Sequence, residues 1–300
     1  MISVCIPVYN RYVSELVKAL KKESESSGIR VEILLLDDAS EKAYRQSNSK
    51  LAEISGVKYN ELGHNAGRSR VRNLLYEQST QQYLLFLDCD TIPANDNFLE
   101  AYAENATPGT VVCGGHIYSK DPPSPDYLLH WLAGTRREVK PAGLRQQQPY
   151  RSFMSSSFLI CRNVFENIRF SEKLAGYGHE DTLFGYELMK AGIELRHIDN
   201  PAVHTGLEKA DTFLEKSVEA LNNLLAAMDI TISDPGFMQS VKILRTYKRI
   251  RKYKLCGIYR FISGIFSGPM RSNLKGPSPR LWVLDLYKLS VLCQKGRELT

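Results

Sequence analysis

The stretch LLFLDCDTIP, residues 84–93, places four apolar residues directly before two carboxylates, Asp88 and Asp90, which a single cysteine separates. An apolar run of this length that ends in polar residues predicts a buried strand whose tip reaches the surface. Because side chains alternate along an extended segment, Asp88 and Asp90 would share one face while Cys89 points into the protein. Two carboxylates at this spacing suit Mg²⁺ or Mn²⁺, with the phosphates of a substrate completing the coordination shell.

Two other predicted strands also end in polar residues. The run ISVCIPVY, residues 2–9, leads to Asn10, and the run VEILLL, residues 31–36, leads to Asp37 and Asp38. In a doubly wound sheet, ligands bind outside the carboxyl ends of the strands, so these side chains should converge with the first acidic pair on one crevice. For any single Asp at the junction of a strand and a helix, a helix cap or a turn is the alternative role.

The order of the predicted elements indicates the fold class. Apolar strands alternate with amphipathic helices from the N-terminus to a strand expected over 110–118. This pattern predicts an α/β fold with a doubly wound, Rossmann-like and mostly parallel sheet that is covered on both faces. A return strand over 152–162, a helix over 180–192 and a strand over 193–199 extend it. The stretch 119–151, with five prolines and dense charge, is predicted to be a long functional or mobile loop.

The composition is that of a globular, enzyme-sized chain. Its 300 residues, 43 % of them hydrophobic, can form one core, or one core with an appended subdomain. The first residues carry no basic leader, and no run of about 18 apolar residues occurs, so neither secretion nor a membrane span is expected. Six scattered cysteines form no CxxC pair, which favours reduced, buried thiols in a cytosolic protein.

The net charge of +6 is unevenly distributed along the chain. Residues 241–300 hold fourteen Lys and Arg against two acids, a net charge of +12, so the first 240 residues carry −6. Residues 238–266 predict a basic amphipathic helix, or two helices interrupted at Gly257, suited to an anionic membrane surface. A helix packed on the domain with a solvated basic side is the alternative. Nucleic-acid binding is disfavoured, because the rest of the chain is acidic and shows no recognition fold.

Five motifs together resemble those of a known enzyme family. In order and spacing, IPVYN (6–10), LLDDAS (35–40), NAGRSRVRN (65–73), FLDCD (86–90) and GYGHED (176–181) resemble the family 2 glycosyltransferases of the GT-A fold, over about residues 1–210. The resemblance implies a GT-A domain over 1–230, with a nucleotide-sugar half (1–118) and an acceptor half (119–230). Residues 231–300 would then form a basic helical C-terminal extension.

The resemblance also implies a site for a nucleotide-sugar donor. The turn after the first strand and the acidic pair after the second would hold the nucleoside, and Asp88 and Asp90 would form the family's DxD motif and bind Mn²⁺ or Mg²⁺. Arg68, in the loop and helix start after residue 64, is expected near phosphate, with Arg72 as structural support; a solvated basic helix face is the alternative. The implied donor-binding residues are Pro7, Tyr9, Asn10, Asp37, Asp38, Asn65, Gly67, Arg68, Asp88 and Asp90.

The motif GYGHED would supply the catalytic groups. By resemblance, Asp181 is the general base that deprotonates the acceptor hydroxyl, and Glu180 holds the acceptor, so that the sugar is transferred with inversion. The two glycines would permit close approach of the backbone to a ligand, and the implied acceptor-binding residues are Glu180, His179, Tyr177 and Ser156. Acids that only favour the helix N-terminus are the alternative for the Glu-Asp pair.

A histidine is the remaining candidate ligand of the cation. His204 follows the Glu-Asp pair by about twenty residues, near the position where similar transferases use a histidine as a third metal ligand. A neutral imidazole suits Mn²⁺ better than Mg²⁺. The implied metal set is therefore Asp90, His204 and Asp88, with Asp90 as the direct ligand and Asp88 reaching the ribose, or the metal through water. A turn histidine without metal is the alternative.

These observations predict a metal-dependent inverting glycosyltransferase. Its donor would be a nucleotide sugar, with a UDP-sugar as the leading candidate, and its acceptor a glycan or lipid-linked molecule in cell-surface polysaccharide synthesis. It would be cytoplasmic and peripheral at the inner face of the membrane. A nucleotidyltransferase is disfavoured because IPVYNRY, residues 6–12, contains no glycine for a phosphate loop. A catalytically silent, membrane-recruited binding module would have lost its base or a metal ligand. The sugar and the oligomeric state stay open.

Overall fold

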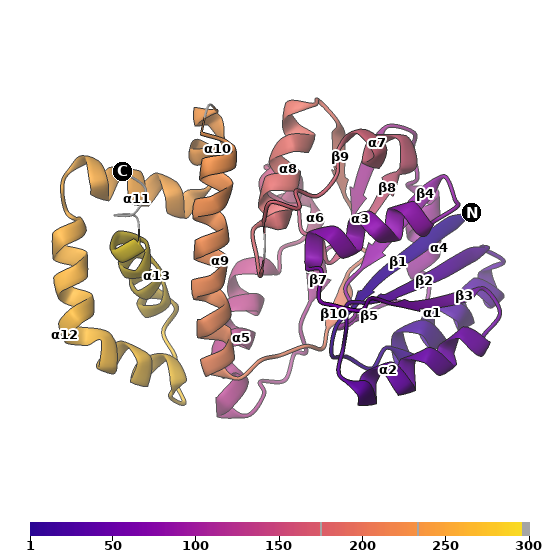
Figure 1. Ribbon diagram of the computed structural model, residues 1–300, viewed down its shortest axis with the longest axis horizontal. Coiled ribbons are helices and arrows are strands. Elements are labelled where there is room, and N and C mark those ends of the chain that lie inside the picture. Colours follow the sequence, from indigo (N-terminus) through magenta and orange to yellow (C-terminus); the bar gives the residue numbers. More distant parts are fainter. Residues whose placement is uncertain (175, 233, 296–300) are drawn as a thin grey trace. The chain divides into compact units, whose positions relative to one another are not determined.

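A seven-stranded sheet, built from strands between residues 2 and 197, organises the first part of the chain (Figure 1). The computed structural model describes residues 1–174, 176–232 and 234–295. The strand order is β3-β2-β1-β4-β8-β6-β9, and every neighbouring pair is parallel except the two pairs made by β8. The predicted mostly parallel α/β sheet is therefore confirmed. The strands are β1 (Ile2–Val8), β2 (Val31–Asp37), β3 (Val57–Glu61), β4 (Tyr83–Leu87), β6 (Thr110–Cys113), β8 (Ser157–Cys161) and β9 (Glu194–His197).

Helices cover both faces of this sheet because its strands are apolar on both sides. In β1, Val4 and Ile6 enter one buried cluster, whereas Cys5 enters the other. Helices α1 (Ser14–Ser27) and α4 (Phe98–Glu104) contribute to the first cluster. Helices α3 (Arg68–Gln78), α7 (Arg162–Asn167) and α8 (Glu180–Lys190) contribute to the second. The short helix α2 (Lys42–Asn48) lies between β2 and β3 in the chain.

A second, smaller sheet follows the carboxyl end of β4. It consists of β5 (Thr91–Pro93), β10 (Ala202–His204) and β7 (His116–Ile117), in that order. The single strand expected over 110–118 is therefore two strands in two sheets. Gly114 and Gly115 separate them: Gly115 has a φ of 83°, and a Cβ on Gly114 would lie 2.3 Å from the carbonyl oxygen of Asn200.

The stretch 119–151 is mostly helical, so the expectation of a long loop was wrong. It contains α5 (Leu128–Ala133), a π-helical turn (Gly134–Glu138) and α6 (Ala142–Gln146), with 3₁₀ turns at Pro125–Tyr127 and Tyr150–Ser152. Two buried side chains, those of Leu129 and Arg145, attach this stretch to its surroundings. Leu129 is fully buried, and Arg145, 3 % exposed, donates hydrogen bonds to the carbonyl oxygens of Cys113, Gly114 and Ile198.

The chain forms two compact units. The first contains residues 1–119, 139–174 and 180–206, and the second contains 120–138, 176–179 and the described residues from 207 onward. This division differs from the predicted boundary at residue 230, because α9 (Ala210–Ile230) belongs to the second unit as a whole. There, Leu214 of α9 packs in a buried cluster with Leu129 and Leu284.

The second unit is helical after α9. Helices α10 (Pro235–Ser240), α11 (Lys242–Lys252), α12 (Cys256–Lys275) and α13 (Leu281–Lys295) follow one another. The predicted interruption at Gly257 was wrong, since the chain turns three residues earlier at Lys254, which has a φ of 57°, and Gly257 lies inside α12. In the described ranges, no helix is both long and apolar enough to cross a membrane.

Candidate functional site

The turns after β1 and β2 are tied to each other by Asn10. Its backbone has a φ of 49°; its N–H donates to Ser40 Oγ at 2.8 Å, and its Oδ1 accepts from the N–H of Glu41 at 2.8 Å. Tyr9 beside it is 51 % exposed, and Pro7 is half-buried within β1. Of the three residues predicted to hold a nucleoside here, Tyr9 is therefore the most accessible to a ligand.

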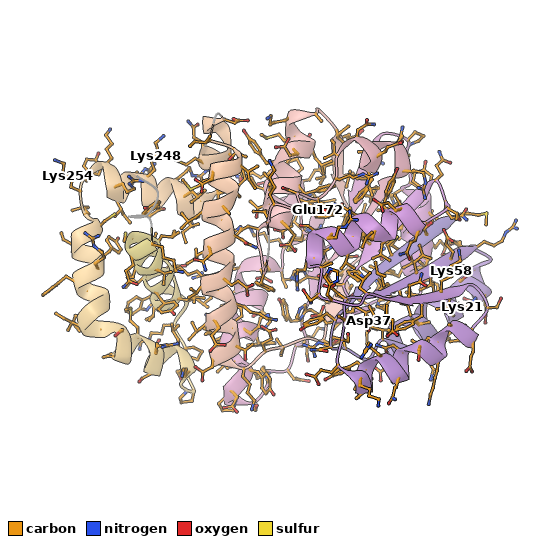
Figure 2. The ribbon with its side chains drawn as sticks, in the orientation of Figure 1. Lys21, Asp37, Lys58, Glu172, Lys248 and Lys254 are labelled. Carbon is orange, nitrogen blue, oxygen red and sulfur yellow. The ribbon has the colours of Figure 1, made fainter. Side chains whose placement is uncertain are left out.

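The two acids at the end of β2 are buried. Asp37 is fully buried, and its Oδ1 accepts a hydrogen bond from the N–H of Ser40 at 2.7 Å. Figure 2 labels Asp37. Its other carboxylate oxygen is buried without a hydrogen-bond partner among the described residues. Asp37 therefore supports the turn from inside, and a direct contact with a nucleoside needs a water or a movement of the turn.

Asp38 holds the loop that precedes α3. Its Oδ1 and Oδ2 accept from the N–H groups of Ala66 and Gly67 at 2.6 and 3.0 Å, and its carbonyl oxygen accepts from Asn65 Nδ2 at 3.3 Å. Gly67 has a φ of 85°, which explains the glycine at this position. Burial raises the pKa of Asp38, although the two N–H groups act against the shift. Asp38 thus orders the loop that leads to Arg68.

The acidic pair after β4 lies in a turn and not in the extended strand that was expected, but Cys89 between the two acids packs against the first buried cluster, as predicted. Strand β4 ends at Leu87, and the carbonyl oxygen of Asp88 accepts from the N–H and the Oγ1 of Thr91 at 3.2 and 2.7 Å. The two carboxylates have different partners. Asp88 Oδ1 accepts from Arg72 Nη2 at 2.7 Å, whereas Asp90 Oδ2 lies 3.6 Å from His204 Nε2.

Arg72 joins two of the acids inside the first unit. Its side chain is 1 % exposed, and besides Asp88 it contacts Glu180, with Nη1 at 3.5 Å from Oε1. Its guanidinium also lies over the ring of Phe170, 5.2 Å from the centroid. Arg68, one turn earlier on α3, reaches the same Glu180 oxygen at 3.5 Å but remains 42 % exposed. Arg72 is therefore an internal cation, and Arg68 is open to solvent.

Glu180 and Asp181 begin α8, and their surroundings push their pKa values apart. Burial raises the pKa of Glu180, but Arg68 and Arg72 outweigh it, so the net shift is downward. Burial, together with the neighbouring Glu180 carboxylate, raises the pKa of Asp181 to about 7. Asp181 Oδ1 accepts from the N–H of Thr182 at 2.6 Å. A carboxyl group with such a pKa can exchange a proton at neutral pH, which suits a general base.

The carboxylate of Asp90 and the imidazole of His204 lie close together, with Oδ2 3.6 Å from Nε2. Gly206, which the sequence analysis missed, makes room for Asp90, since a Cβ on it would lie 2.3 Å from Asp90 Oδ2. Burial raises the pKa of Asp90, but His204, Arg68 and Arg11 outweigh it and lower the pKa. A carboxylate and an imidazole suit Mn²⁺, with further oxygens from a ligand.

The predicted metal trio of Asp88, Asp90 and His204 is not brought together. Over the described part of the chain, no three His, Cys, Asp or Glu side chains lie close enough to hold a metal ion. The physical reason is that the Asp88 carboxylate pairs with the buried Arg72 guanidinium. A cation bound here would therefore be ligated by no more than two of these side chains, those of Asp90 and His204.

A histidine that the motifs did not select lies next to this site. His116 Nδ1 is 3.4 Å from Ser156 Oγ, and the carbonyl oxygen of Ser156 accepts from the N–H of Asp88 at 3.0 Å. The ring of His116 lies 6.2 Å from that of His204, and the rings of Tyr118 and His204 are 5.1 Å apart. Ser156, predicted to bind the acceptor, is thus joined to the acidic turn. In the sequence, the only unusual feature of this segment is the pair Gly114 and Gly115 before His116.

The segment 176–179 belongs to the second unit, and its glycines have a structural role. A Cβ on Gly176 would lie 2.3 Å from Glu219 Oε1, and one on Gly178 would lie 2.7 Å from the Cβ of Ala220. Both therefore allow close packing on α9, and a close approach of their backbone to a ligand stays a prediction. The N–H of Tyr177 donates to Glu219 Oε1 at 2.9 Å. Binding of an acceptor by Tyr177 and His179 stays a prediction.

Comparison with known protein families gives a match over more than half of the chain. The model of the family Glycosyl transferase family 2 matches residues 3–169. The search of the curated proteins found no match.

Solved structures share the fold. S. aureus TarS 1–349 is 19 % identical, with a TM-score of 0.51, over 100 % of this chain and 92 % of that one. In another crystal structure of S. aureus TarS, with 21 % identity and a TM-score of 0.50, the match covers 75 % of this chain and only 39 % of that chain.

The mannosyltransferase PcManGT from Pyrobaculum calidifontis, solved with GDP-Man and Mn²⁺, is 12 % identical. Its TM-score is 0.57, over 99 % of this chain and 87 % of that one. At these identities the similarity concerns the fold, and it confirms the predicted GT-A type.

Proposed function

We propose that this chain, which belongs to glycosyl transferase family 2, transfers the sugar of a nucleotide sugar to a glycan or lipid-linked acceptor, with inversion at the anomeric carbon. One observation carries the proposal. The buried Arg72 connects Asp88, in the acidic turn after β4, to Glu180, beside Asp181, whose pKa is raised to about 7. Arg72 thus links the acidic turn, a candidate part of the donor site, to the start of the helix that carries the candidate base.

The donor would bind at the carboxyl ends of β1, β2 and β4. Tyr9 is exposed there, and the loop ordered by Asp38 presents Asn65, Gly67 and the half-exposed Arg68, whose guanidinium suits a diphosphate. Pro7, Asn10 and Asp37 shape the turns around it. A UDP-sugar is the leading candidate. S. aureus TarS 1–349 was solved with UDP and PcManGT with GDP-Man, so GDP is the comparison to make.

Asp90 and His204 would hold the divalent cation, as a carboxylate and an imidazole suit Mn²⁺ and Gly206 leaves them the space. When bound, such a cation offsets the negative charge that develops on the leaving nucleoside diphosphate. Asp88 takes part through Arg72 instead of through the metal, because Arg72 Nη2 already occupies its Oδ1 at 2.7 Å.

Asp181 would act as the general base. It takes the proton of the acceptor hydroxyl while the oxygen attacks the anomeric carbon and the bond from that carbon to the diphosphate breaks on the opposite side. Glu180, kept ionised by Arg68 and Arg72, raises the proton affinity of Asp181 and can accept a hydrogen bond from the acceptor. Inversion follows from attack opposite to the leaving group.

The acceptor and the cellular place are further parts of the proposal. Ser156, Tyr177 and His179 are the candidate acceptor contacts besides Glu180. A lipid-linked glycan of cell-surface polysaccharide synthesis, reached from the cytoplasmic face of the membrane, fits the net charge of +12 in residues 241–300. The silent-module alternative is not favoured, because Asp181, Asp90 and His204 are all present.

Ligand-dependent thermal stability tests this function directly. UDP and GDP are added at a hundredfold excess over their dissociation constants, each with and without Mn²⁺, and the melting temperature is measured. UDP with Mn²⁺ should stabilise the fold by about 2.7 kcal/mol. Asp90→Asn should remove the Mn²⁺ dependence, and Asp96→Asn, an exposed acid on the same unit, serves as the control. No shift with either nucleotide, whether or not Mn²⁺ is present, would contradict the proposal.

A further inference from the structure

The first half of α12 exposes apolar side chains to an unusual degree. Thirteen large hydrophobic residues are exposed in the part of the chain that the structure describes, and six of them lie between positions 253 and 266. Ile258, Phe261 and Ile265 are 55 %, 69 % and 55 % exposed, and their spacing places them on one face of the helix. The complete set is Tyr253, Leu255, Ile258, Phe261, Ile265 and Phe266.

The neighbouring helix α11 has already packed its apolar face. Leu244, Tyr247 and Ile250 are 0 %, 4 % and 5 % exposed. The second half of α12 is also anchored, since Met270 and Leu274 belong to the buried cluster of the second unit. The two roles considered for the basic tail therefore fall to different segments: α11 is packed on the unit, whereas the first half of α12 presents an uncovered apolar face to solvent.

The chain segment that carries this face contains basic residues and no acidic ones. Between Asp234 and Asp285 the chain contains eleven Lys and Arg and no acid. Lys248 on α11 and Lys254 in the turn before α12 are exposed, and Figure 2 shows both pointing outward from this end of the unit. The other exposed basic residues near the turn are Arg249, Arg251 and Lys252.

We propose that this surface docks on an anionic phospholipid bilayer, with Ile258, Phe261 and Ile265 entering the headgroup boundary and the basic side chains of α11 and the turn contacting lipid phosphates. Apolar burial and attraction to anionic lipid act together in such interfacial helices. The charge selects this occupant over a second copy of the chain, because a symmetric dimer through this face would bring two clusters of positive charge together.

The binding itself requires neither donor nor acceptor. One consequence of the binding rests on the proposed function: a transferase bound in this way meets an acceptor that is anchored in the same membrane. The two proposals can therefore fail separately. Vesicle binding tests the surface, and the nucleotide-dependent thermal shift of the same protein tests the function.

Co-sedimentation of the full chain with vesicles is the experiment. Vesicles of phosphatidylcholine with phosphatidylglycerol should bind the protein at low salt, and pure phosphatidylcholine should bind it weakly. Phe261→Ser with Ile265→Ser should lower the affinity for anionic vesicles about tenfold or more. Lys252→Glu with Lys254→Glu should have a similar effect at low salt and a smaller one at high salt.

Matched controls separate a local surface from general properties. Met189→Ser removes an apolar residue, 41 % exposed, from the first unit, and Lys22→Glu with Lys50→Glu makes the same change in net charge there. Both should bind vesicles as the unchanged protein does. Equal loss in these controls, or full binding by the α12 variant, would overturn the proposal. A different result would also overturn it: the unchanged protein is a dimer in sedimentation velocity, the variant Phe261→Ser with Ile265→Ser is a monomer, and neither of the two proteins binds vesicles.

Discussion

The two units of this protein use charge in opposite ways. In the first unit, Arg72 is 1 % exposed and lies between two carboxylates, those of Asp88 and Glu180. In the second unit, Lys252 and Lys254 are exposed in a stretch that contains no acid. Buried charges at fixed distances interact strongly and set one another's pKa values. Exposed charges act over a distance and are screened by salt. The first arrangement suits chemistry at defined atoms, and the second suits attraction to a charged surface.

Replacing the candidate base should have the largest effect on the first unit. Asp181→Asn cannot take a proton, so we expect the transfer rate to fall by about 10²- to 10⁴-fold. Binding of nucleotide and cation should change little, because Asp181 is placed on the acceptor side of the proposed reaction. Initial rates and calorimetric titration with UDP and Mn²⁺ measure both effects. Asp96→Asn, at an exposed acid, is the control. An equal loss of nucleotide binding in Asp181→Asn would show that the role is wrong.

Removing the internal cation should break the network. Arg72→Met leaves Asp88 and the buried Glu180 without their shared partner, and we expect the free energy of unfolding to fall by about 3–5 kcal/mol. Denaturant titration measures it. Arg70→Met, at an arginine whose side chain is 43 % exposed on the same helix, should cost far less. Comparable losses in the two variants would contradict the difference between buried and exposed charge.

A smaller, local effect is expected at Gly206. In Gly206→Ala, the new Cβ would lie 2.3 Å from Asp90 Oδ2, so the carboxylate must move away from its present position near His204. The apparent affinity for Mn²⁺, measured by titrating activity, should fall about tenfold, as is typical when the orientation of a ligand is disturbed. Gly143→Ala, with no atom within 4 Å of the added carbon, is the matched control. Unchanged Mn²⁺ dependence in Gly206→Ala would argue against Asp90 as a ligand.

The smallest effect on catalysis should come from the second unit. Lys252→Glu with Lys254→Glu changes exposed charge only, so transfer to a water-soluble acceptor should stay within about twofold at any salt concentration. The same rates with a lipid-linked acceptor in anionic vesicles should fall. A large loss with the water-soluble acceptor would show that the two arrangements of charge are not independent.

Much of the fold was predictable from local patterns, because apolar runs and their polar ends are encoded in neighbouring residues. The strands that precede Asn10, Asp38 and Asp88 are examples. Features that depend on distant contacts were not predictable. Arg72 was expected to be structural support, but its partners Asp88 and Glu180 lie sixteen and 108 positions away and could not be identified from the sequence.

The glycines show the same limit. Gly176 and Gly178 suggested a ligand, but the residues they approach are Glu219 and Ala220 on α9. The role of Gly206 becomes visible only when Asp90 is placed beside it. The position of the turn before α12 likewise depends on the left-handed backbone at Lys254 and not on the nearby Gly257.

The pH dependence of kcat/KM tests the central claim, that Asp181 is the base, most directly. The pKa of Asp181 is raised from 3.8 to about 7, so the fold disfavours the ionised form. The protonated side chain therefore contributes to the stability of the fold below about pH 4, and this contribution is lost as the pH rises through 7. Because the base must be ionised to act, kcat/KM should rise about tenfold per unit below pH 7 and level off above it. A profile that stays flat from pH 5 to 8, or that rises near pH 4, would contradict the account.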